Sequence, residues 1–431
     1  MAILYGKNGR KDDLVLRGVR VLDPVEGIDE CLDVHVEGGV ITRLVAGTPA
    51  RQDGRELVAA PAFVDPHVHL RTPGREDEED LRSGTRAAAA GGYCAVFAMP
   101  NTDPVVDSAA VLRALVERAR SEASVPVGFL AAISKRQDGK ELTEMVELAE
   151  AGAAGFSDDG RPVVAPGLMR RALQYGTVAK RRVAVHCEEP TLSSGGHVHE
   201  GLVSAELGFG GYPSVAESVM VERDLALAAY ERQPLHLLHL SARESVEALR
   251  RARAAGLEAT AEVTPHHLCL TDEAVRSLDP NVKMNPPLRS EDDRKALADA
   301  LRDGTIGAVA TDHAPHARQE KEVPFEEAPF GVTGLETAFP ALYTRLVEPG
   351  LLTLATLLER MSAGPARIFG LEPPRIALGA EANLVLLDLA ATWVVGAGSF
   401  RSKSANSWLL GETLTGKVVK TLAAGKVVYA A

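Results

Sequence analysis

Residues 65–71 read Asp65-Pro66-His67-Val68-His69-Leu70-Arg71 and follow the apolar run Pro61-Ala62-Phe63-Val64. Side chains two positions apart in an extended strand point to the same side, so His67 and His69 can present two imidazole nitrogens to one metal ion. Zinc takes imidazole and carboxylate ligands. A His-x-His pair is not sufficient evidence, because the chain carries a second one, His197-Val198-His199, in a Gly/Ser-rich loop with no strand before it. The surroundings of each pair therefore decide which of them is a candidate metal site.

Short apolar runs alternate with helical patterns along the chain, as in βαβ units that build a parallel sheet. The expected strands are 61–64, 95–98, 127–131, 154–156, 183–185, 235–238, 258–263 and 307–310. The helical patterns cover 108–122, 142–151, 168–179, 215–230, 242–255 and 291–302. Eight such strands predict an α/β fold, a closed (β/α)8 TIM-type barrel rather than an open sheet.

The two ends of the chain share a different pattern. Residues 14–22, 34–37 and 40–44 read as short strands, with Gly38-Gly39 as a hairpin turn. Val-rich runs return in 383–388 and 417–429. We therefore expect residues 1–60 and 376–431 to form one small composite β domain and residues 61–375 to form the metal-dependent catalytic barrel.

Composition excludes several classes of function. The 431 residues are 45% apolar and 25% charged, which is ordinary for an enzyme, and the formal net charge of -12 argues against nucleic acid and anionic membrane surfaces as partners. The richest apolar run, Ala87 to Met99, is too short to span a membrane, and Met1 to Asp13 shows no secretory pattern. We expect a cytoplasmic protein. Its four widely spaced cysteines predict buried, inert thiols: Cys31, Cys94, Cys187 and Cys269.

Possible metal ligands collect at the strand ends, where barrels of this kind carry their reactive side chains. They are His67 and His69 after the first strand, Asp158 and Asp159 after the fourth, His186 after the fifth, His239 after the sixth and Asp312 after the eighth. Four imidazoles and two carboxylates, with only one of Asp158 and Asp159 counted, exceed what one catalytic zinc takes. The pattern predicts two ions sharing a carboxylate, with a water between them acidified to hydroxide near neutral pH.

Seven motifs carry a resemblance to a known family over nearly the whole chain. They are 65–74 (DPHVHLRTPG), 99–102 (MPNT), 156–160 (FSDDG), 264–268 (TPHHL), 284–289 (MNPPLR), 311–316 (TDHAPH) and 329–336 (PFGVTGLE). On these residues the chain resembles the amidohydrolase superfamily and, within it, the class I bacterial dihydroorotases. Many relatives bridge their ions with a carboxylated lysine, whereas residues 156–160 contain no lysine and match the aspartate bridge of class I.

The resemblance implies one or two zinc ions per subunit, with two predicted. The implied ligands are His67, His69 and Asp312 for one ion and His186 and His239 for the other. Asp159 would bridge the ions, on its spacing to His186, and Asp158 stays the alternative.

The resemblance also implies a binding site for a substrate with a ring and a carboxylate. The carboxylate would be held by Arg71, Asn101 and His316, and the ring amide groups by Asn285 and the backbone of Phe330 and Gly331. Arginine suits this role because its planar fork matches a carboxylate in a way that lysine cannot. One departure is Thr72, where relatives often carry an acid, but the metal ligands are intact.

The implied activity is the reversible closure of N-carbamoyl-L-aspartate to L-dihydroorotate in de novo pyrimidine (UMP) biosynthesis. In the hydrolytic direction a bridging hydroxide would attack the ring carbonyl, with Asp312 as general acid and base. The resemblance leaves a homodimer and an association with aspartate transcarbamoylase open.

Two other functions are weighed against this one. A hydantoinase- or allantoinase-like cyclic amidohydrolase is disfavoured by Arg71, because an uncharged ring would leave a buried guanidinium unpaired. An inactive paralogue that acts as a scaffold for aspartate transcarbamoylase is disfavoured by the complete ligand set.

The remaining histidines and acids have simpler interpretations. We expect His266 and His267 to pack in the interior or to support the metal ligands, His313 to orient a rim loop, and His236 to lie in the core. The acidic run 76–80 predicts a solvated helix start, where the helix dipole favours acids.

Overall fold

The parallel sheet of the computed structural model, which describes residues 4–7, 9–49 and 57–431, contains eight strands in sequence order. They are β5 (Phe63–Val68), β6 (Tyr93–Ala98), β7 (Val127–Ala131), β8 (Gly155–Ser157), β9 (Arg182–Val185), β12 (Leu235–Leu237), β13 (Ala259–Val263) and β14 (Ala308–Val309). A parallel bridge between Val68 and His313 joins the last strand to the first, and the His69 amide donates to the His313 carbonyl at 2.9 Å. The predicted (β/α)8 barrel is confirmed.

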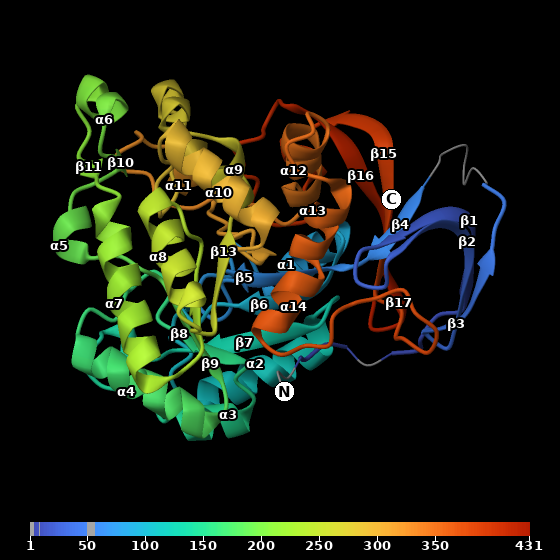
Figure 1. Cartoon of the computed structure of the whole chain (residues 1–431), viewed down its shortest axis with the longest axis horizontal. Coiled ribbons are helices and arrows are strands. Elements are labelled where there is room, and N and C mark those ends of the chain that lie inside the picture. Colours follow the sequence, from blue (N-terminus) through green and yellow to red (C-terminus); the bar gives the residue numbers. More distant parts are fainter. Residues whose placement is uncertain (1–3, 8, 50–56) are drawn as a thin grey trace.

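Helices surround the barrel strands (Figure 1). They include α1 (Leu81–Ala90), α2 (Ala109–Glu122), α3 (Met145–Ala151), α4 (Pro166–Ala179), α7 (Val215–Glu231), α8 (Arg243–Ala254), α10 (Glu291–Asp303), α13 (Leu354–Met361) and α14 (Ala363–Ile368). Shorter elements are α5 (Pro190–Ser193), β10 (Val198–His199), α6 (Leu202–Leu207), β11 (Gly211–Tyr212), α9 (Pro265–Cys269), α11 (Arg318–Lys321) and α12 (Ala338–Leu342). Every residue of β5, β6 and β7 is buried, as expected for parallel strands covered on both faces.

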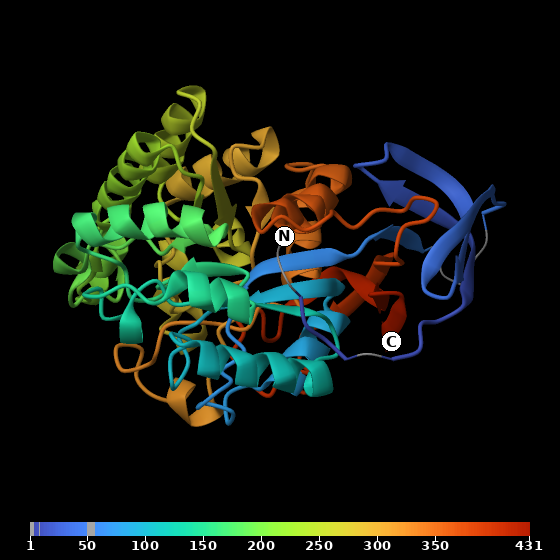
Figure 2. The ribbon, with the colours of Figure 1, turned by 90° about the horizontal axis from the view of Figure 1, so that it is seen from below.

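A second sheet combines the two ends of the chain, with the strand order β17-β16-β15-β4-β1-β2-β3. These strands are β1 (Leu14–Asp23), β2 (Ile28–Glu37), β3 (Val40–Ala46), β4 (Val58–Pro61), β15 (Leu384–Val394), β16 (Thr413–Ala423) and β17 (Lys426–Ala430). The blue and red strands lie together on one side of the barrel (Figures 1 and 2). Only Ala62 separates β4 of this sheet from the first barrel strand, β5. The domain limits at residues 60 and 376 stay predictions.

The prediction that the acidic run 76–80 is a solvated helix start is correct only in part. Asp80 does cap the helix, since its carboxylate accepts a hydrogen bond from the Ser83 amide at 2.8 Å. Glu78 and Glu79, however, are buried. Their partners explain this: Glu79 lies 3.2 Å from the His313 imidazole, and Glu78 lies 2.9 Å from Arg71 Nε. Contacts with Arg71 and His313, which are distant in sequence, therefore hold two acids inside the fold.

Two further expectations concern thiols and membranes. All four cysteines are free, with Cys94 and Cys187 buried and Cys31 and Cys269 half-buried. Among the described residues, none of the helices has the length and apolar character needed to cross a membrane.

Candidate metal centre and active site

Six side chains predicted as metal ligands converge at the carboxyl ends of the barrel strands. All are buried: His67, His69, Asp159, His186, His239 and Asp312. Three of the residues around this point have left-handed backbone despite carrying side chains: Arg71 (φ 52°), His239 (φ 28°) and Asp312 (φ 47°). Such conformations cost energy and cluster at functional sites, where surrounding structure holds them in place.

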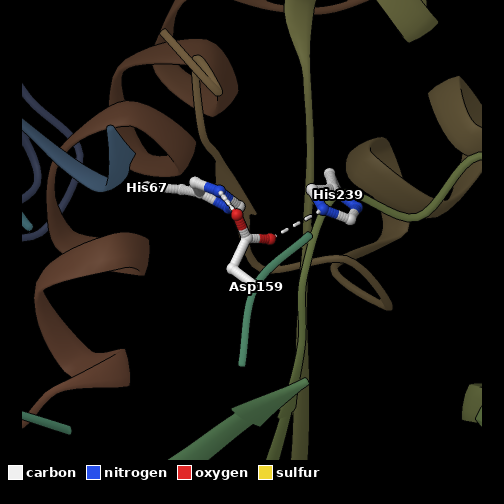
Figure 3. Close-up of side chains that lie close together, drawn as sticks. All are labelled: His67, Asp159 and His239. Carbon is white, nitrogen blue, oxygen red and sulfur yellow. Dashed lines mark hydrogen bonds and ion pairs between the residues drawn. The ribbon is translucent and has the colours of Figure 1, made fainter. Parts of the chain in front are cut away.

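Asp159 lies between two pairs of histidines. Its Oδ2 is 3.5 Å from Nε2 of His67 and 3.5 Å from Nε2 of His69. Its Oδ1 is 3.3 Å from His239 Nε2 and 3.7 Å from His186 Nδ1. Figure 3 shows the carboxylate reaching His67 with one oxygen and His239 with the other. One carboxylate thus faces both halves of the centre.

Asp158 points elsewhere. Its Oδ1 accepts hydrogen bonds from the backbone amides of Ile133 at 2.8 Å and Ser134 at 3.1 Å. Its other oxygen accepts from the Ser134 hydroxyl. Asp158 therefore fixes the loop after β7, and of the two neighbouring aspartates only Asp159 has the position of a bridge.

Asp312 completes one half of the centre. Its Oδ1 lies 3.0 Å from His69 Nε2 and 3.5 Å from His67 Nε2, so these three residues could share one ion. His67, Asp159 and His239 form a second group with ligand atoms within 4.8 Å of one another. His186 joins the other half, with its Nδ1 3.0 Å from His239 Nε2.

The donor set fits a metal ion. His67 Nε2 is buried without a hydrogen-bond partner, although it points at the carboxylates of Asp159 and Asp312. Burial alone would raise the pKa of the Asp159 carboxyl, but the imidazoles around it, His67 foremost, hold that pKa well below its usual value. Ionised carboxylates and imidazoles are the ligands that zinc and related divalent metals prefer.

Glu262 contacts the predicted metal ligand His67 and was not identified from the sequence. It lies in β13, and its Oε1 is 2.7 Å from His67 Nδ1 while its Oε2 is 2.9 Å from His236 Nε2. Burial opposes ionisation, yet the two imidazoles lower the pKa of Glu262 to about 2. The signal was available, since Glu262 is the one acid in Ala-Thr-Ala-Glu-Val, a strand otherwise without charge. His236 is in the core, as predicted, and supports this carboxylate.

Changing Glu262 to glutamine is expected to weaken metal binding by ~10- to 100-fold, because a carboxylate that accepts from Nδ1 orients the ligand imidazole and strengthens its donor nitrogen. Competition with a chelator on the purified protein measures this. Glu258→Gln is the matched control, since Glu258 precedes the same strand with an exposed side chain and pairs with Arg182. Equal metal affinity of the Glu262→Gln protein and the wild type would rule out the orienting role.

Two more side chains contact predicted metal ligands. Asn101 Oδ1 lies 2.9 Å from His69 Nδ1, and Glu188 Oε2 lies 2.9 Å from His186 Nε2. Asn101 also approaches Asp159 Oδ2 at 3.4 Å through its amide nitrogen. Asn101, predicted as a substrate contact, therefore also contacts the predicted metal ligand His69.

The other histidines have partners of their own. His267 bonds Thr264 Oγ1 at 2.7 Å and the Pro286 carbonyl at 3.0 Å, and burial lowers its pKa to about 3. His313 accepts from the Gly334 amide at 3.2 Å in addition to its contact with Glu79. The second His-x-His pair lies at β10, where His199 Nδ1 is 3.3 Å from Arg289 Nη1. That pair is in none of the potential metal-binding groups found among the described residues.

A cavity of about 380 Å³ opens over the centre. Its lining includes all six residues predicted to bind substrate: Arg71, Asn101, Asn285, His316, Phe330 and Gly331. His69, Asp159, His186, His239 and Asp312 form part of the same wall. The structure therefore brings the metal ligands and the predicted substrate contacts to one cavity.

Arg71 is buried at one end of this cavity. Its Nε donates to the Pro315 carbonyl at 3.1 Å and faces Glu78 Oε2 at 2.9 Å. Burial, with the nearby Arg75, lowers the pKa of Arg71 to about 10, so the guanidinium stays charged at neutral pH. Its Nη2 lies 3.5 Å from His316 Nε2. Because Nε is occupied, the Nη nitrogens are the ones left for a ligand.

Arg75 is a second cation that the sequence interpretation did not single out. It lines the cavity, pairs with the buried Glu78 and lies 2.8 Å from Glu320 Oε1. The carboxylates of Glu78 and Glu320 thus partly balance the two guanidinium groups at this end of the cavity.

Similarity to known proteins assigns the family. A model of the dihydro-orotase-like family matches residues 54–245. The dihydroorotase of Geobacter metallireducens is 45% identical over 422 residues, which cover 97% of this chain and 99% of that protein. The chain belongs to the dihydroorotase family. The dihydroorotase of Syntrophus aciditrophicus is likewise 44% identical, over 96% of this chain and 99% of its own length.

Solved structures agree with the fold. The L-hydantoinase of Arthrobacter aurescens superposes with a TM-score of 0.86 at 25% identity, covering 97% of this chain and 96% of its own. The dihydropyrimidinase of Brevibacillus agri superposes with a TM-score of 0.80 at 21% identity, over 97% and 95%. This dihydroorotase-family chain therefore has the predicted barrel and belongs to a family of enzymes that hydrolyse cyclic amides, and the predicted resemblance is confirmed.

Proposed function

We propose that the enzyme interconverts N-carbamoyl-L-aspartate and L-dihydroorotate in de novo pyrimidine biosynthesis, with two zinc ions in the centre. The observation that carries the proposal is the single cavity in which Asp159 faces two histidine pairs while the buried Arg71 lies at one end. A substrate with a cyclic amide and a carboxylate matches both features at once.

The proposed ligands are those named by the resemblance. One ion would be held by His67, His69 and Asp312 and the other by His186 and His239, with Asp159 shared. When bound, such ions lower the pKa of a water and polarise a carbonyl oxygen. Zinc is proposed over magnesium or calcium because the donors include four imidazoles, which suit zinc.

Asp312 is the proposed proton carrier. It lines the cavity next to His69 and is within reach of a water placed between the two halves of the centre. It would take a proton as water attacks the ring carbonyl and give it to the ring nitrogen that leaves. One carboxylate can serve both steps when it remains close to both atoms.

Arg71, Asn101 and His316 are the proposed contacts of the substrate carboxylate. The Nη nitrogens of Arg71 are oriented by the contacts that its Nε makes with Glu78 and Pro315. His316 Nε2 donates to the Phe330 carbonyl at 2.8 Å, which ties this end of the cavity to the segment that carries Phe330 and Gly331. The ring amides would meet Asn285 and that backbone.

A hydantoinase-like activity is the second candidate, because the chain superposes on the L-hydantoinase of Arthrobacter aurescens. The buried Arg71 argues against it, because a ring without a carboxylate would leave the guanidinium without its ligand. An inactive scaffold is disfavoured by the complete ligand cluster. A homodimer, an association with aspartate transcarbamoylase and a cytoplasmic location stay predictions.

The test is to measure zinc content and turnover of dihydroorotate, dihydrouracil and allantoin by the purified protein. We expect zinc to co-purify with the protein. We also expect kcat/KM for dihydroorotate to exceed that for dihydrouracil by at least ~100-fold, because dihydrouracil cannot make the hydrogen bond between a carboxylate and the guanidinium. Preference for an uncharged ring would reject the proposal, and a metal-free, silent protein would favour the scaffold.

The matched variant is Arg71→Met, which keeps the volume and removes the charge. It is expected to reduce the preference for dihydroorotate over dihydrouracil to below ~10-fold, because most of the discrimination would come from the carboxylate contact. An unchanged preference would remove Arg71 from the binding site.

A further inference from the structure

Glu188 joins a proposed metal ligand to a proposed substrate contact. It lies two residues after His186, and its side chain is 16% exposed. Its Oε2 is 2.9 Å from His186 Nε2 and 3.0 Å from Asn285 Nδ2, and its Oε1 accepts from the Ser193 hydroxyl. A single carboxylate oxygen therefore contacts both residues.

This contact decides which way the Asn285 amide points. An ionised carboxylate only accepts hydrogen bonds, whereas a side-chain amide has one end that donates and one that accepts. The donor end of Asn285 must face Glu188, so Oδ1 has to point away from it. Asn285 Oδ1 is indeed buried and without a hydrogen-bond partner.

Asn285 lies where two cavities meet. It lines the catalytic cavity and also a neighbouring one of about 320 Å³, which Glu188, Ser193 and Tyr212 border. The unpaired Oδ1 is thus a buried acceptor on a residue that lines the catalytic cavity. Leaving such an acceptor unpaired is costly, so a ligand that supplies a donor gains affinity.

We propose that Glu188 is a positioning residue that holds the Asn285 amide with its oxygen toward the substrate, so that the enzyme selects a ring nitrogen that bears hydrogen. The inference rests on the proposed function, because dihydroorotate supplies two such N–H groups. Glu188 acts through Asn285 on substrate recognition and, separately, through His186 on the centre.

A double-mutant cycle tests the first of these links. Asn285→Ala removes the acceptor and is expected to raise KM for dihydroorotate about tenfold. Glu188→Gln is expected to raise KM at least as much, because a glutamine can donate to Asn285 and turn the amide so that its NH2 meets the ring N–H. In the double variant the Glu188→Gln effect on KM should disappear, since no amide is left to turn.

The controls separate binding from folding and metal content. Ser193 donates to Oε1 of Glu188, whereas Asn285 donates to Oε2, so Ser193→Ala is expected to change KM by less than roughly threefold. Zinc content and kcat are measured for each variant, because loss of the His186 contact would alter these rather than KM. If the KM factors of the two single variants multiply in the double variant, the positioning role is overturned.

A measurement on the unchanged protein does not depend on the folding of any variant. Dihydroorotate methylated at one or the other ring nitrogen is compared with the parent compound. We expect one isomer to lose at least ~100-fold in kcat/KM, and Asn285→Ala to reduce that loss to below ~10-fold. Acceptance of both isomers by the wild type would overturn the inference. Absence of dihydroorotate turnover by the zinc-loaded wild type would instead reject the proposed function.

Discussion

Asp312→Asn is expected to lower turnover of dihydroorotate by at least ~100-fold, the low end of what a positioned acid-base group contributes. Asparagine has nearly the same shape and keeps an oxygen that can bind metal, so the centre should stay assembled. What it cannot do is take up a proton in the carboxylate's place. The loss is therefore expected in kcat, with KM changed much less.

The measurement combines steady-state kinetics with metal analysis of the same preparation. Asp312 is held by the imidazoles of His69 and His67 at 3.0 and 3.5 Å, and these residues are unchanged in the variant. A near-normal kcat with full metal content would remove Asp312 from proton transfer. A low kcat together with lost metal would assign it to metal binding alone.

Asp159→Ala is expected to cost more, on the order of 1,000-fold in turnover, because the proposed shared ligand would be lost and several kcal/mol of electrostatic stabilisation would depend on the two ions. The zinc content should fall below two ions per subunit. Removal of zinc from the wild type by a chelator should reproduce the loss, and addition of zinc should restore activity only to the wild type.

Asp158→Ala is the matched control, one residue away. Asp158 accepts from the Ile133 and Ser134 amides, so its loss leaves buried donors unpaired and is expected to lower the free energy of unfolding by about 1–3 kcal/mol. Zinc content should stay near that of the wild type. Loss of zinc in Asp158→Ala but not in Asp159→Ala would reverse the assignment of the bridge.

The architecture was predictable because its signals are local. Eight apolar runs separated by helical patterns indicate a parallel barrel independently of the loop sequences, because buried parallel strands need continuous apolar sequence. The position of a ligand directly after a strand also places it, because carboxyl ends of barrel strands share one rim. His67, His186 and Asp312 were assigned to one centre on this basis, and the structure brings them together there.

Several contacts could not be predicted from local sequence patterns, because they join residues that are far apart in the sequence. Glu262 contacts His67 across 195 residues, and Glu188 contacts Asn285 across 97. Glu78 and Glu79 were expected in solvent because an acidic run before a helix normally lies there. In the fold they contact Arg71 and His313 and are buried.

The motif at residues 65–71 separates what the sequence determined from what the tertiary structure decided. Sequence by itself determined the barrel, the family resemblance and the strand ends that supply His67, His69 and Arg71. Only the tertiary structure decided that Asp159 faces both histidine pairs while Asp158 bonds the Ile133 and Ser134 amides. The physical reason is that apolar periodicity sets which segments are buried, whereas the direction of a polar side chain depends on the hydrogen-bond partners that folding brings to it.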